Sequence, residues 1–177
     1  MDRMTRTPEE LLEAAKHVTY EIKMLVFAAD HLGHGHSCPP TKPSGNEKHM
    51  ALESFLLHFR NLRAFLCPSL QCVYREDILA GDFYESPRRE DVVAPERLAR
   101  DVERLNGMLA HLSYERRSYT AAGPYNWKTT EMAAAAVEEL RAFLATLPPD
   151  RAAWFPGASW LDDAAGRFKA MAPIWDA

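Results

Sequence analysis

Residues 49–66, HMALESFLLHFRNLRAFL, carry apolar side chains on almost every side of a helix. One face holds apolar residues at alternating intervals of three and four, the helical repeat: Leu52, Phe55, Phe59, Leu62 and Leu66. Further leucine, alanine and phenylalanine side chains fall on the remaining sides. A helix that is apolar nearly all round is normally buried on several sides. We therefore expect a helix over 47–66 at the centre of a helical bundle.

Other segments repeat the same periodicity. The first expected helix covers 8–32, and residues 7–10, Thr-Pro-Glu-Glu, have the form of a capping box with proline at the first helical position. Two more long helices are expected over about 95–118 and 127–147, and a shorter one over about 160–171. Each has an apolar stripe on one side, which must be buried against a neighbouring element.

No segment alternates between apolar and polar residues in the way a half-buried strand does. Residues 33–46 are rich in glycine, proline and serine and are expected to form a loop. The pattern predicts one all-α domain over 1–177, an antiparallel bundle of four long helices with a short C-terminal helical tail.

Composition narrows the possible functions. The chain has 177 residues, 47% of them hydrophobic and 26% charged, which is typical of a soluble globular domain. Its formal net charge is −4, so any contact with nucleic acid requires a local basic patch. No glycine-rich phosphate loop, His-Glu-x-x-His motif or di-iron Glu-x-x-His pair occurs, and we expect no cofactor.

The sequence also bears on location. Three cysteines argue against a disulfide framework and suit a reducing compartment. No apolar segment follows the charged N-terminus, and no run of about 18 apolar residues could span a bilayer. We expect a cytoplasmic protein that does not enter a membrane.

The third expected helix has a second, polar face. At about 100° per residue, one arc away from its leucine stripe collects Arg97, Arg100, Arg104, His111 and Tyr114. Arginine binds phosphate in a two-pronged geometry, and histidine moves protons near neutral pH. Such an arc could bind and cleave a phosphodiester. It could equally be a solvated surface, because acidic residues follow Arg97 and His111 at a distance of four residues.

The stretch RLNGMLAHLSYER, within an all-helical chain, resembles the HEPN superfamily of prokaryotic helical proteins. Many members are metal-independent endoribonucleases of toxin and phage-defence systems, with an arginine followed a few residues later by a histidine on one helix. The catalytic cleft forms where two such helices meet in a homodimer. The resemblance implies that Arg104 and His111, separated by six residues, are catalytic. It also implies that Arg97 and Arg100 follow the RNA backbone and that Tyr114 stacks on a base.

Two other interpretations stay open. In one, the protein is a non-catalytic module and the same helix face binds a second copy or another protein. In the other, it is a metal-binding regulator whose loop supplies His31, His34, His36 and Cys38, residue types that bind zinc. The loop lacks a standard zinc-ligand spacing, so we assign no metal site.

The central helix contains polar residues of its own. Ser54, His58 and Asn61 lie on one side at intervals of four and three. Buried polar groups must find hydrogen-bond partners. These three either form a network that fixes the register between helices or line a polar pocket.

Overall fold

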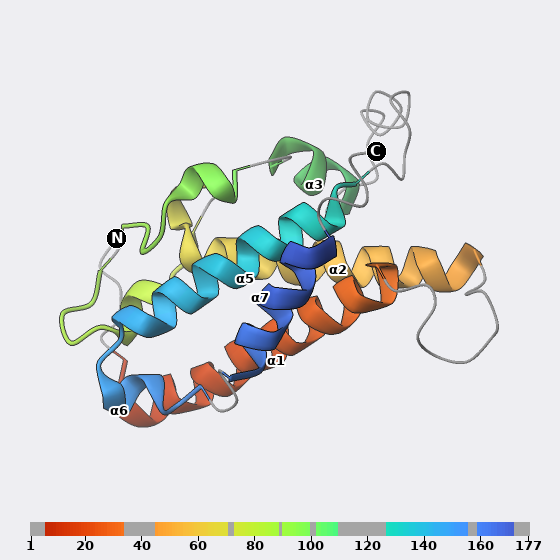
Figure 1. Ribbon diagram of the computed structural model, residues 1–177. Coiled ribbons are helices and arrows are strands. Elements are labelled where there is room, and N and C mark those ends of the chain that lie inside the picture. The colour runs from red at the N-terminus through yellow and green to blue at the C-terminus, as the bar shows by residue number, and fades with distance from the viewer. Residues whose placement is uncertain are drawn as a thin grey trace.

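The computed structural model describes residues 6–33, 45–70, 73–88, 90–99, 102–109, 127–155 and 159–171. Within these ranges the regular structure is entirely helical and no strand occurs, which confirms the all-α prediction (Figure 1). The α-helices are α1 (Pro8–Gly33), α2 (Gly45–Leu66), α3 (Val102–Leu109), α5 (Thr129–Thr146), α6 (Pro149–Ala152) and α7 (Ser159–Met171). None of the helices in the described ranges combines the length and apolarity that a membrane crossing requires.

The start of α1 has the hydrogen bonds that its sequence predicts. The backbone N–H of Thr7 donates to Oε2 of Glu10 at 2.8 Å, and the backbone N–H of Glu10 donates to Oγ1 of Thr7 at 3.2 Å. These two bonds form the expected capping box, with Pro8 at the first helical position. The helix then continues to Gly33, one residue beyond the expected end.

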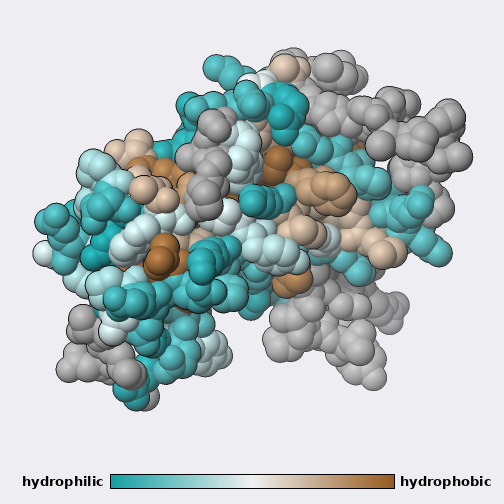
Figure 2. Space-filling view, turned by 90° about the horizontal axis from the view of Figure 1, so that it is seen from below, coloured by the Kyte–Doolittle hydropathy of each residue, from teal (hydrophilic) through white to brown (hydrophobic). Residues whose placement is uncertain are grey.

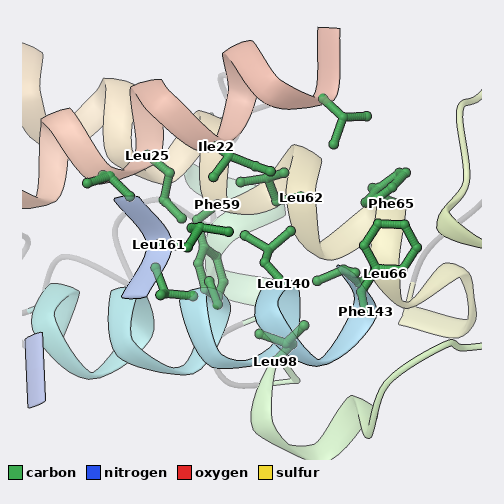
Figure 3. Packing of buried hydrophobic residues seen from close by; sticks show 14 of the residues in the cluster. Ile22, Leu25, Phe59, Leu62, Phe65, Leu66, Leu98, Leu140, Phe143 and Leu161 are labelled. Atoms are coloured by element: carbon green, nitrogen blue, oxygen red, sulfur yellow. The ribbon is translucent and has the colours of Figure 1, made fainter. Parts of the chain in front are cut away.

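Helix α2 is the central element. It packs against α1, α5 and α3, and also against two short 3-10 turns, η1 (Pro68–Leu70) and η2 (Ala80–Phe83). Side chains from α1, α2 and α5 meet in one interior, joined by Leu98 and by Leu161 of α7 (Figure 3). In Figure 1, α1, α2 and α5 run along the long direction of the molecule, and α7 crosses in front between α5 and α1. The apolar circumference of α2 therefore has partners on several sides.

The third expected helix differs from its prediction over 95–118. Pro95–Arg97 form a 3-10 turn, η3, closed by the backbone N–H of Leu98, which donates to the carbonyl of Pro95 at 2.9 Å. Leu98 and Ala99 are not helical, and the described α-helix α3 covers Val102–Leu109. Leu98 is fully buried. The non-helical backbone at Leu98 and Ala99 lets its side chain enter the core ahead of α3. Residues 110–118 of the prediction lie outside the described ranges.

Five aromatic rings form a cluster at one end of the core. Phe143 of α5 lies at its centre, with ring centroids 5.3 Å from Phe65, 6.4 Å from Phe83, 6.3 Å from Tyr84 and 5.8 Å from Phe155. Its contacts are edge-on, the geometry that aromatic pairs favour. Because Phe83 and Tyr84 come from the segment after α2, the cluster fastens this connection to the bundle.

Phe143→Ala is expected to lower the free energy of unfolding by about 3–5 kcal/mol, since it removes the central ring and leaves a cavity. The matched control is Phe27→Ala, because Phe27 of α1 is 66% exposed. Chemical denaturation measures both. A loss in Phe143→Ala no larger than in the control contradicts this account of the core.

Candidate functional site

The structure describes two of the five residues expected on the polar arc. Arg97 and Arg104 lie in the described ranges, whereas Arg100, His111 and Tyr114 fall outside them. The proximity of Arg104 to His111 therefore stays a prediction.

Arg97 contacts two carboxylates on α5. Its Nη1 atom lies 2.9 Å from Oε1 of Glu139 and 3.0 Å from Oε2 of Glu138. Glu139 is buried, and its hydrogen bond is the main cause that raises the pKa of Arg97. Arg97 therefore fastens η3 to α5, and an approaching phosphate would compete with these carboxylates for it.

Arg104 has a different environment. Its guanidinium carbon lies 3.9 Å from the centre of the Trp127 ring, and this stacking restrains the half-buried side chain. The next residue, Leu105, is fully buried and anchors α3 in the core. Trp127 lies two residues before the start of α5, so the stack joins α3 to the start of that helix.

Helices α1 and α2 are linked by a partly buried hydrogen-bond network. Oε2 of Glu21 accepts a hydrogen bond from Nδ1 of His58 at 2.7 Å and another from Nδ2 of Asn61 at 3.1 Å. His58 is 7% exposed, and its ring meets that of Tyr20 edge-on. Of the three polar residues singled out on α2, His58 and Asn61 thus form the expected inter-helix network. Asn61 also lines a cavity, so the two interpretations of these residues apply together.

This cavity, about 600 Å³ in volume, opens between α1, α2, α3 and residues 74–79. Its polar wall combines donors with three carboxylates and includes His17, Glu21, Arg60, Asn61, Tyr74, Glu76, Asp77 and Asn106. Nε of Arg60 donates to Oδ1 of Asn106 at 3.1 Å, and this bond joins α2 to α3 at the cavity wall. The size and the mixture of polar and apolar groups are typical of a ligand-binding site.

Sequence reasoning did not identify Glu21, Arg60 and Arg63 as site residues. Arg63 is 1% exposed on α2, and burial lowers its pKa to about 10, with a further lowering from the positive charge of Arg60. A signal for Arg63 was present, because it occupies the same helical face as Leu56, Phe59 and Leu66. A charged residue within an apolar face indicates a special environment.

Within the described ranges, neither the candidate zinc ligands nor Cys67 forms a metal site or a reactive thiol. His31 is exposed at the end of α1, stacked with Phe27 at 6.4 Å, while His34, His36 and Cys38 lie outside those ranges. In the part of the chain that is described, no three His, Cys, Asp or Glu residues are grouped as metal ligands. Burial raises the pKa of the Cys67 thiol to about 12, so it stays protonated and is a poor nucleophile at neutral pH.

Glu21→Ala is expected to lower the free energy of unfolding by about 1–3 kcal/mol, because it leaves His58 and Asn61 without their acceptor. The control is Glu13→Ala, which removes an acid from the exposed surface of α1 where Glu13 pairs with Lys16. Thermal unfolding compares the two variants. Equal melting temperatures for both would contradict a linking role for Glu21.

Comparison of the chain with protein-family models, with curated proteins and with solved structures finds no match in any of the three.

Proposed function

We propose that the protein is a HEPN-like, metal-independent endoribonuclease that acts as a homodimer through Arg104 and His111. The observation that carries the proposal is the restrained position of Arg104, whose guanidinium stacks on Trp127 at 3.9 Å. A group that stabilises charge in a transition state is most effective when its position is fixed in advance. The expected antiparallel arrangement of four long helices is part of the same proposal.

Both flanks of α3 support this role. Arg104 joins it to the start of α5, and Asn106, two residues later, accepts a hydrogen bond from Arg60 of α2. Leu105 between them is buried in the core. These three contacts prevent rotation of α3 about its axis, so a substrate meets a fixed arrangement of polar groups.

In the proposed reaction the ribose 2′-oxygen attacks the neighbouring phosphorus. Its proton passes to His111, the bond from phosphorus to the 5′-oxygen breaks, and the leaving oxygen takes a proton from solvent water. The products are a 2′,3′-cyclic phosphate and a free 5′-hydroxyl. Arg104 stabilises the negative charge on the phosphate, Arg100 and Arg97 contact the backbone, and Tyr114 stacks on a base. Arg97 exchanges one of its carboxylate contacts for a phosphate.

A second candidate function, a non-catalytic interaction module, is favoured by an exposed apolar surface. The α1/α2 apolar face consists of large side chains that are exposed on these two helices: Leu12, Tyr20, Phe27, Met50 and Leu57. Figure 2 looks onto the side of the molecule where α1 lies, and brown and tan side chains gather there. Large apolar side chains exposed near one another mark contacts with other proteins, and a second copy of the chain is the simplest partner.

The ribonuclease proposal is tested by RNA cleavage in EDTA. His111→Ala is expected to reduce cleavage about 100-fold or more, because it removes the proton-transfer group. His31→Ala, on the exposed end of α1, is the control and should cleave as the wild type does. Melting curves establish that both variants are folded. Cleavage by His111→Ala within about twofold of the wild type removes the assignment.

The interaction module is tested by measuring whether the protein is a monomer or a dimer in solution. Phe27→Asp places a charge on the α1/α2 apolar face, and sedimentation should then show monomers where the wild type forms dimers. Glu13→Lys, also exposed on α1, controls for the change of charge. Dimers that persist in Phe27→Asp show that the copies associate elsewhere.

A further inference from the structure

Arg63 places a positive charge inside the protein. It is 1% exposed on α2. Its Nε, Nη1 and Nη2 atoms are all buried, and none makes a hydrogen bond within the described part of the chain. A buried and unpaired guanidinium opposes folding, and an apolar side chain of similar volume would be more favourable at this position. Stability therefore gives no reason for arginine here.

Arg60, one helical turn earlier, lines the cavity between α1, α2 and α3. Its Nε donates to Asn106, and within the described ranges its two terminal nitrogens make neither a hydrogen bond nor an ion pair. The Oδ1 atom of Asn106 accepts that bond, which leaves its Nδ2 group as a further donor at the same wall. The wall thus presents hydrogen-bond donors and positive charge together.

The two arginines differ from others in the described structure. Several other arginines are neutralised by a carboxylate, as in the pairs Arg6–Glu76, Arg97–Glu139, Arg141–Asp162 and Arg167–Asp30, and Arg88 instead lies over the ring of Tyr84. Arg60 and Arg63 are three residues apart on one helix, so their guanidinium groups are neighbours. The charge of Arg60 lowers the pKa of Arg63, which still remains protonated at neutral pH. Carboxylates line the same cavity, but within the described ranges none lies within ion-pair distance of Arg60 or Arg63. Two neighbouring positive charges without such a pair favour a bound anion.

We propose that the α2–α3 wall of this cavity binds a phosphate group, with Arg60 and Asn106 as its direct hydrogen-bond donors and Arg63 as a buried source of positive charge. The phosphate site does not depend on cleavage, but its assignment to RNA rests on the proposed function. Three carboxylates, those of Glu21, Glu76 and Asp77, also line the cavity. They repel a phosphate, which therefore binds at the α2–α3 wall, and they suit the hydroxyl and amino groups of a nucleotide unit. Tyr74, 72% exposed at the rim, is available to stack on its base.

The test uses two probes, inorganic phosphate and a 2′-O-methyl RNA oligonucleotide, which lacks the 2′-hydroxyl needed for cleavage. Phosphate should raise the melting temperature of the wild type above that in chloride of equal ionic strength, because a ligand of the native state stabilises it. Fluorescence anisotropy measures binding of the labelled oligonucleotide at fixed salt. No response of the wild type to either probe overturns the proposal.

The variants are Arg60→Gln and Arg63→Met, with Arg141→Gln as a control that removes the same charge from the surface of α5. Arg60→Gln should lose the rise with phosphate and bind the oligonucleotide about tenfold more weakly, as expected for a lost charge-assisted contact. Arg63→Met should melt at a higher temperature than the wild type without phosphate and respond less to it. An undiminished phosphate response in Arg60→Gln overturns the site, and one in Arg63→Met overturns the role of the buried charge.

The outcomes separate this site from the ribonuclease activity. A phosphate response that Arg60→Gln abolishes, in a protein that cuts no RNA, supports the site and removes the proposed function. Cleavage that depends on His111, without any response to phosphate or to the oligonucleotide, supports the proposed function and overturns the phosphate site. A response to phosphate alone assigns the cavity to a small phosphorylated ligand and overturns its assignment to RNA.

Discussion

The register between α1 and α2 depends on the carboxylate of Glu21. It accepts hydrogen bonds from His58 and Asn61, one turn apart on the facing helix, so a slip of α1 along α2 would break both. In a core of apolar side chains many registers bury similar areas, whereas a polar contact of this kind is satisfied in only one. Because the cavity lies between the same two helices, its shape depends on the register that these hydrogen bonds fix.

Helix α2 therefore both stabilises the fold, through its apolar residues, and destabilises it, through its positive charges. Its apolar residues form the centre of the core, while Arg60 and Arg63 introduce positive charge beside that core. The fold tolerates Arg63 because the aromatic and leucine packing around α2 supplies a large stabilisation from apolar burial. A buried charge lowers the stability of the fold. Residues that oppose folding in this way are expected at functional sites.

Much of the fold could be predicted from the sequence because its signals are local. The capping box at Thr7 and Glu10 and the apolar repeat of α2 each lie within one element. The break at Leu98 could not be predicted, since it depends on whether the core has room for that side chain. The candidate site was harder to predict from the sequence than the fold. Arg104 was singled out, but its stacking partner Trp127 is distant in the sequence, and Glu21 acquires its role only when α2 lies beside it.

Overall charge decides how such a site could recognise RNA. The formal net charge is −4, so long-range attraction of a polyanion is weak, and many surface arginines are already neutralised by carboxylates. Affinity for RNA would then come from a few short-range contacts with Arg60 and Arg104, assisted by the buried charge of Arg63, in surroundings that solvent screens poorly. Few phosphate contacts release few counterions, so binding depends only weakly on salt. Recognition by this protein would therefore select one or two nucleotides held in the cavity, rather than a long stretch of backbone.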